Sequence, residues 1–251
     1  MLLLAFTQSA RSGIRVQSVQ SGNLFLTEET VQIPLTSDGT EIRWKVTDYF
    51  GNQVAEGQEV PASKKAVIEP ALSGVGYFDL HISERNGATV TSELTTSFAI
   101  LTPINITARD DSPFGVMTHF AQHNDPAVMT VLSRAGICHI RDEQYWNAIE
   151  TQRGVYTYPQ EFTSYMNSAA ALSLRPLLVL DWSNRFYDFD NGDYTFPYTE
   201  SGRKGYVNYA LNVLDRYPGQ IRAVEVWNEI NAGTFIAGPA TADKPGYYSL
   251  L

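Results

Sequence analysis

Polar and aromatic side chains stand directly after four apolar runs in the second half of the chain. They are His119 after 114–117, Arg141 after 137–140, Asp181 and Trp182 after 176–180, and Trp227, Asn228 and Glu229 after 221–226. A glutamate can act as a general acid or base, and an arginine can hold an anion through paired hydrogen bonds. Residues of these types at the ends of successive strands predict a site for acid–base chemistry.

Each of these residues also has a purely structural explanation. Glu229 could stabilise the start of a following helix. Arg141 could pair with Asp142 or Glu143, its neighbours along the chain. Trp182 could belong to the core. The residue types alone leave these alternatives open.

A metal or a cofactor is not expected. His119 and His123 have the i, i+4 spacing of two zinc ligands on a helix, but the sequence offers no evident third ligand, and His123 follows the strand in a loop. No glycine-rich phosphate loop follows the apolar run that ends at Met117.

The elements that position these residues alternate between strand and helix. Apolar strands are expected at 114–117, 137–140, 176–180 and 221–226, with helices beginning at Asp125-Pro126 and lying around 162–172, 206–214 and 247–251. The apolar stripe of the first helix is expected at Val128, Val131, Leu132 and Ala135, and the second helix is expected around Phe162, Tyr165, Met166, Ala169 and Leu172. This alternation predicts a parallel sheet covered by helices. A doubly wound sheet usually has a glycine-rich turn after its first strand, and none is present here. We therefore expect an α/β fold with the first half of a (β/α)8 TIM barrel, whose active site lies at the carboxyl ends of the strands.

The first part of the chain follows a different pattern. Apolar and polar residues alternate with period two over several short segments between residues 13 and 101. Asp38-Gly39, Gly51-Asn52 and Asn86-Gly87 supply turn signals that suit tight hairpins. About seven such strands predict an immunoglobulin-like β-sandwich. A polar segment at 102–113, which contains the glycosylation triplet 105–107, is expected to link it to a catalytic domain at 114–251.

Three segments resemble the clan A glycoside hydrolases. The run 224–231, with Trp227-Asn228-Glu229, resembles their fourth-strand signature, although Ile230 stands where proline is usual. The segment 135–156 is similar to their second-strand region. The first apolar run and its histidine resemble the branch that contains family 39 β-xylosidases and bacterial exopolysaccharide hydrolases. The likeness covers residues 113–251.

The resemblance implies roles for individual residues. Glu229 would be the acid/base of a retaining hydrolase, and Asn228 would bond the sugar 2-hydroxyl. Arg141 would point at the nucleophile, a second carboxylate about 5–5.5 Å from the acid. The side chains that would line the sugar subsite are His119, Trp182 and Trp227.

The clan places its nucleophile on the seventh strand, and a barrel of this kind needs about 250 residues. We therefore expect the chain to be the front part of a longer enzyme, truncated after the fourth β/α unit and inactive alone.

Charge and hydropathy limit the classes of molecule that the protein is expected to bind. The formal net charge is −9, with no basic run, which disfavours nucleic acid and anionic membranes and suits a poly- or oligosaccharide. Residues 1–12 are similar to the remnant of a secretory signal peptide, so we expect a secreted or cell-envelope protein; no segment is long and apolar enough to span a membrane. The alternative is a non-catalytic carbohydrate-binding or scaffold protein with a degenerate half barrel.

Overall fold

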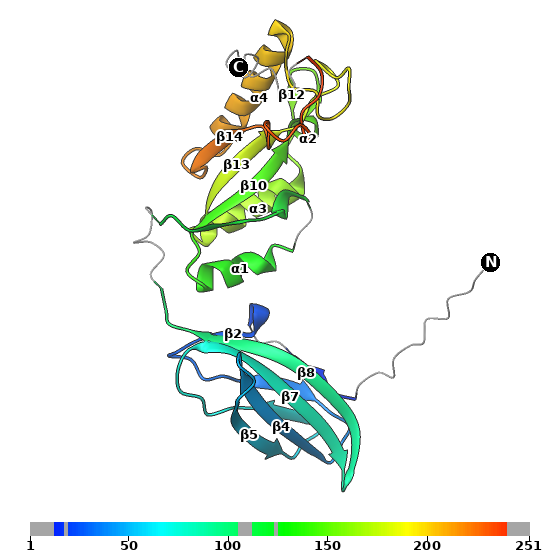
Figure 1. The fold of residues 1–251 in the computed structure, drawn as a ribbon, viewed down its shortest axis with the longest axis vertical. Coiled ribbons are helices and arrows are strands. Elements are labelled where there is room, and N and C mark those ends of the chain that lie inside the picture. The colour runs from blue at the N-terminus through cyan, green and yellow to red at the C-terminus, as the bar shows by residue number, and fades with distance from the viewer. Residues whose placement is uncertain (1–12, 18–19, 105–111, 123–124, 240–251) are drawn as a thin grey trace, which may run out of the picture. The chain divides into compact units, whose positions relative to one another are not determined.

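The computed structural model describes residues 13–17, 20–104, 112–122 and 125–239 (Figure 1). The chain divides into two compact units, Met1–Ile104 and Asn105–Leu251. Four sequence features lie outside the described residues: the signal-like segment 1–12, the glycosylation triplet 105–107, His123, and the helix expected at 247–251.

The first unit consists of two β-sheets. One has the strand order β1–β3–β6 and the other the order β2–β8–β7–β4–β5. All pairs are antiparallel except β2 with β8, which is parallel. The elements are β1 (Arg15–Val16), the 3-10 turn η1 (Ser21–Asn23), β2 (Leu24–Leu26), β3 (Ile33–Thr36), β4 (Glu41–Asp48), β5 (Gln53–Glu59), β6 (Lys65–Ile68), β7 (Gly76–Asn86) and β8 (Thr89–Leu101).

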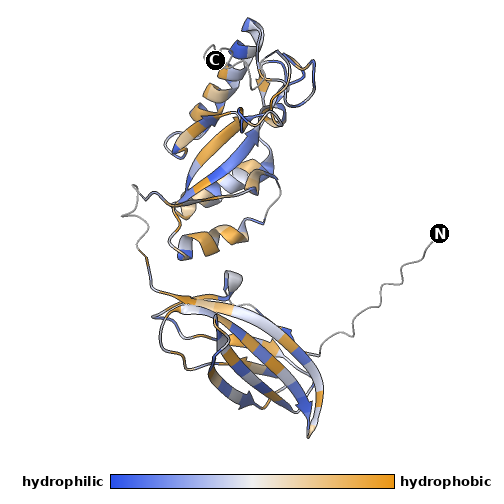
Figure 2. Cartoon of the chain, viewed as in Figure 1, coloured by the Kyte–Doolittle hydropathy of each residue, from blue (hydrophilic) through white to orange (hydrophobic). Residues whose placement is uncertain are grey.

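Alternating hydropathy builds the core of this unit. Figure 2 shows the strands of the larger sheet striped by apolar and polar residues, as expected where only one face is buried. In β4 the buried residues are Ile42, Trp44 and Val46. They belong to the same apolar cluster as Ile33 and Leu35 of the smaller sheet, so the two sheets share one core.

Two of the three predicted hairpins are present. Gly51 and Gly87, with φ of 83° and 60°, lie in the turns that join β4 to β5 and β7 to β8. The expectation for Asp38-Gly39 was wrong. These residues connect β3 to β4, which belong to different sheets. The dipeptide predicts a change of direction, but it carries no information on which strands pair.

The second unit contains a four-stranded parallel sheet of order β14–β13–β10–β9. Strand and helix alternate along the chain as predicted. The elements are β9 (Gly115–Met117), the 3-10 turn η3 (Phe120–Gln122), α1 (Ala127–Arg134), β10 (His139–Tyr145), α2 (Trp146–Ile149), the small hairpin β11 (Glu150–Gln152) and β12 (Val155–Tyr156), α3 (Gln160–Ala171), β13 (Arg175–Asp181), α4 (Glu200–Arg216) and β14 (Ala223–Val226).

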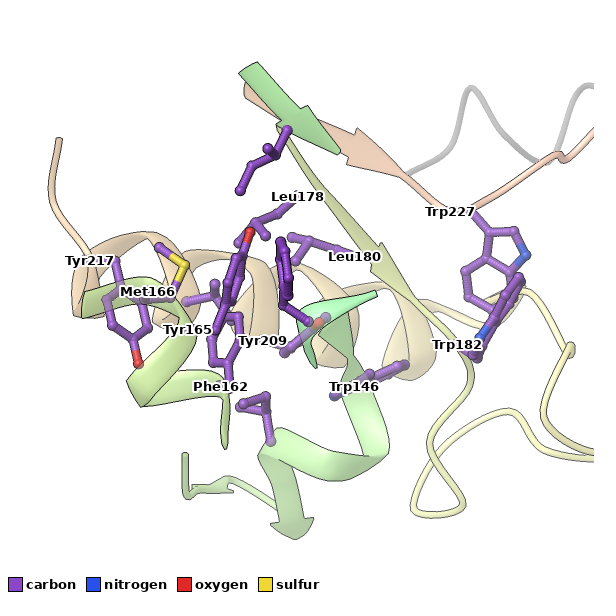
Figure 3. Close-up of a cluster of buried hydrophobic side chains, with 14 of the residues drawn as sticks. Trp146, Phe162, Tyr165, Met166, Leu178, Leu180, Trp182, Tyr209, Tyr217 and Trp227 are labelled. Carbon is purple, nitrogen blue, oxygen red and sulfur yellow. The ribbon is translucent and has the colours of Figure 1, made fainter. Parts of the chain in front are cut away.

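Helices α3 and α4 pack on one face of this sheet. Figure 3 shows their side chains between the helices and the strands, where Tyr165 and Tyr209 lie against Leu178 and Leu180. The apolar stripe predicted for α3 is confirmed, since Phe162, Tyr165, Met166 and Ala169 are its buried residues. No helix of the described residues covers the opposite face with a comparable apolar cluster.

Helix α1 has a different buried side from the one expected. The stripe predicted from Val128, Val131, Leu132 and Ala135 is only partly correct, because Leu132 packs against the core but Val128 is 47% exposed and Met129 is the fully buried residue. Apolar residues of several sizes on one side of a helix do not determine which of them faces the core. A small rotation of the helix about its axis therefore changes the buried residue. None of the helices in the described part of the chain could cross a membrane, since none combines the required length and apolar character.

Candidate active site

The register of the parallel sheet assembles a cluster of charges on the face opposite α3 and α4. Arg141 of β10 stands beside Leu177 of β13, and the next pleat aligns Glu143, Val179 and Glu225. Neighbours in register point to the same side of a sheet, and so do residues two apart. Arg141, Glu143, Glu225 and Asp181 therefore share one face.

Arg141 is the centre of this cluster. Its Nε and Nη2 atoms donate to the two carboxylate oxygens of Glu225 at 2.8 and 2.7 Å, and Nη2 also donates to Asn228 Oδ1 at 2.7 Å. The hydrogen bond to Glu225 raises the pKa of Arg141. One expectation for Arg141 was wrong: it is the third residue of β10 and not a strand end, because β10 continues to Tyr145. The ion-pair partner of Arg141 is the distant Glu225, and not Asp142 or Glu143 as in the structural alternative.

Asp181 is buried without a direct polar partner among the described residues. It is fully buried, and neither carboxylate oxygen has a hydrogen-bond partner among the described residues. Burial, and next the charge of Glu143, raise the pKa of Asp181 to about 9, against the opposing effect of Arg141. Burial also raises the pKa of Glu143. Asp181 is therefore protonated at neutral pH, as a buried carboxyl without a partner must be.

The segment after β14 has unusual backbone geometry. Trp227 and Glu229 both lie in the left-handed region, with φ of 66° and 48°. Non-glycine residues rarely adopt this conformation, and those that do cluster at functional sites. Asn228 is 8% exposed, whereas the Glu229 side chain is exposed and makes no hydrogen bond to a described residue. The Glu229 carboxylate is therefore accessible to solvent.

The two tryptophans predicted to line the site are largely buried. Trp227 is 1% exposed, and its Nε1 atom donates to the Phe235 main-chain oxygen at 2.7 Å. Trp182 lies edge-on to the Trp227 ring, beside it in Figure 3, and stacks on Phe235. Both indoles are therefore part of the apolar core, and Tyr194, which is 40% exposed, contacts Trp182 edge-on.

The remaining predicted residue, His119, is exposed after β9. Its ring Nδ1 lies 3.3 Å from Gln122 Oε1. His119 also acts on the site electrostatically, because its charge lowers the pKa of Glu143 against the larger effect of burial. The structure thus links His119 to the charged face through Glu143.

Glu143 was not among the predicted site residues, whereas Glu225, which lies within an apolar run, was expected inside the barrel or among the polar contacts below the site, with no catalytic or binding role of its own. Glu225 and Glu143 lie inside strands, where charge is unusual on a sheet that packs against helices. The signal was available in the sequence, because Glu225 interrupts the apolar run 221–226 and so predicts that one face of this strand is polar.

Comparison with solved structures finds a similar fold in a glycoside hydrolase. A family 39 glycoside hydrolase from the gut symbiont Bacteroides cellulosilyticus WH2 matches with a TM-score of 0.71 and 17% sequence identity, over 94% of this chain and 48% of that one. The chain therefore spans about half the length of that enzyme. At this identity the likeness shows a glycoside hydrolase-like fold and leaves the activity open.

Two further solved structures are less similar to the chain. A β-glycosidase, BGL167, gives a TM-score of 0.37 at 14% identity over 43% of this chain and 26% of that one. The chitinase ChiW from Paenibacillus sp. FPU-7 gives a TM-score of 0.28 at 12% identity, over 87% of this chain and 20% of that one. No family model and no curated protein matches the chain.

Proposed function

We propose that the whole protein containing this chain is a retaining glycoside hydrolase that cleaves O-glycosidic bonds in a poly- or oligosaccharide. The observation that carries the proposal is the position of Glu229. It follows the fourth parallel strand, its carboxylate is exposed, and its neighbour Asn228 is held by Arg141 on the charged face of the sheet. The family 39-like fold supports the same conclusion.

The proposed architecture is a (β/α)8 barrel of which this chain forms the first four units. The sequential strand order and the packing of α3 and α4 on one face favour a barrel over a doubly wound sheet, whose helices cover both faces. The charged face is then the barrel interior. The accessory unit at 13–101, the linker at 102–113 and action outside the cell or at its envelope belong to this proposal.

In the mechanism, Glu229 protonates the leaving oxygen while a second carboxylate attacks the anomeric carbon. The nucleophile comes from a later strand. Glu229 then removes a proton from a water molecule whose oxygen attacks the anomeric carbon. The bond to the nucleophile breaks, and the sugar is released with its anomeric configuration retained. Asn228 bonds the 2-hydroxyl, and His119 and Tyr194 lie at the edge of the sugar subsite, with Trp182 and Trp227 behind it. No cofactor takes part.

The test is hydrolysis of aryl glycosides by the whole protein, with the first-formed anomer followed by NMR. The expected result is turnover with retention. Binding of oligosaccharides without turnover would favour the carbohydrate-binding or scaffold alternative, and inversion would contradict the two-step mechanism.

A further inference from the structure

We propose that Glu225 is a positioning residue, which acts through Arg141 to fix the atom that the Asn228 amide presents to the bound sugar. This inference rests on the proposed function, because it assigns a role within that site. It adds a residue that neither the sequence motif nor the fold comparison singles out.

The contact chain spans three strands. Arg141 lies in β10 and Glu225 in β14, and β13 separates them. The guanidinium therefore extends over β13, in the region of Leu177 and Val179, to reach the Glu225 carboxylate with two hydrogen bonds of 2.7 and 2.8 Å. Two parallel hydrogen bonds fix the plane of a guanidinium as well as its position.

The fixed guanidinium orients the Asn228 amide. An arginine N–H can only donate, so the Asn228 atom that lies 2.7 Å from Nη2 must be the oxygen. The Nδ2 group consequently points away from Arg141, and it makes no hydrogen bond to a described residue. Nδ2 is then the donor available for a sugar hydroxyl.

Glu225 is needed because Arg141 has other carboxyl groups within reach of its charge. Glu143 and the protonated Asp181 share its face, and the charge of Glu143 contributes to the raised pKa of Arg141. Without the Glu225 carboxylate, the guanidinium can turn toward Glu143 and release the Asn228 oxygen. The amide can then rotate and present either atom to the ligand, which removes the fixed donor.

The first measurement needs no turnover. The side-chain amide signals of Asn228 are assigned in the whole protein by their loss in Asn228→Ala. In the wild-type chain we expect one sharp pair of signals. In Glu225→Gln we expect the pair to shift and broaden, whereas in the control Glu200→Gln, which removes the exposed ion pair with Lys204, it stays unchanged. An unchanged Asn228 pair in Glu225→Gln overturns the inference, whether or not the whole protein is a hydrolase.

The second measurement uses the whole protein and a double-mutant cycle. Misplacement of a group that orients substrate costs about 10²-fold in rate. We therefore expect Glu225→Gln to lower kcat/KM on an aryl glycoside by roughly 10–100-fold. On the matching 2-deoxy glycoside, Glu225→Gln should have an effect as small as that of the control Glu200→Gln. Glu225→Gln should add little to Asn228→Ala, since both remove one contact. Equal losses on both substrates, or additive losses, overturn the inference; a wild type that turns over neither substrate counts against the proposed function alone.

Discussion

The Thr118 hydroxyl donates a 2.6 Å hydrogen bond to the carboxylate of Asp142, which is fully buried. The same carboxylate accepts the main-chain N–H of Phe120 at 2.8 Å. Asp142 thereby ties the segment that follows β9 to the neighbouring strand. Its side chain lies on the opposite side of β10 from Arg141, so the two consecutive residues serve different faces of the sheet.

Replacement of Asp142 should destabilise the second unit. Asp142→Asn replaces one carboxylate oxygen with an amide NH2 group, which cannot accept the hydrogen bonds that the buried donors around Asp142 make. A buried polar group left unsatisfied costs about 1–3 kcal/mol. We expect the free energy of unfolding in urea to fall by about that amount. The exposed Asp215→Asn is the matched control and should stay within about 0.5 kcal/mol of wild type. Equal stability of the two variants would show that the Thr118 and Phe120 contacts contribute nothing net.

Asp181 predicts a stability that depends on pH. Its carboxyl ordinarily has a pKa of 3.8, and burial raises the pKa to about 9 in the folded chain. Between these values the unfolded chain loses the proton and the folded chain keeps it, so stability falls as pH rises, by at most about 1.4 kcal/mol per pH unit.

The variant Asp181→Asn has no proton to lose. Its free energy of unfolding, measured by urea denaturation between pH 4 and pH 9, should therefore rise relative to wild type as pH increases. A difference that stays constant over this range would mean that Asp181 is ionised in the folded chain.

Glu84 predicts the opposite dependence in the first unit. Burial acts to raise its pKa, but hydrogen bonds from the hydroxyls of Ser37 (2.5 Å) and Thr91 (2.8 Å), together with main-chain N–H groups, outweigh burial and lower it. The stabilisation from these contacts is present above the ordinary pKa of 4.5 and is lost as pH falls through the folded value.

Glu84→Gln should therefore be less stable than wild type at pH 7, by about 1–3 kcal/mol, with the gap closing in acid. Thermal unfolding from pH 2 to pH 7 measures it. Thr91→Val, which removes one donor, should show a smaller gap of the same form. If the difference in stability between wild type and Glu84→Gln persists at pH 2, the effect comes from packing and not from charge.

The elements could be predicted from sequence, while their partners could not. Phe162, Tyr165, Met166 and Ala169 mark one helix face by their spacing alone, and the alternation Ile42, Trp44, Val46 marks a strand in the same way. These signals are local.

Arg141 shows the limit of local signals. Its partner Glu225 is 84 residues away, and the contact exists only because register aligns two strands across a third. The same holds for Asp38-Gly39, where the turn was visible but the change of sheet was not. The spacing of apolar residues along the chain shows which side of a helix or strand is buried. Which other element that side packs against depends on the energy of the whole fold.

The final prediction concerns Glu229 in the whole protein. A substrate with a poor leaving group needs protonation, so Glu229→Ala should slow its cleavage by about 10²–10⁴-fold. An activated aryl glycoside needs little acid assistance, so its first step should survive better. The second step still lacks its base, and the glycosyl-enzyme should accumulate, where mass spectrometry can detect it.

Azide distinguishes this role from a structural one. It attacks the glycosyl-enzyme without a base, so it should restore turnover of the activated substrate and yield a glycosyl azide of retained configuration. If Glu229 only stabilises the segment that follows β14, the variant should lose about 0.5–2 kcal/mol of stability and show no response to azide. A folded Glu229→Ala variant with near-normal turnover of both substrates would mean that the carboxylate after Trp227-Asn228 is not the acid/base, and that the exposed position of Glu229 has another cause.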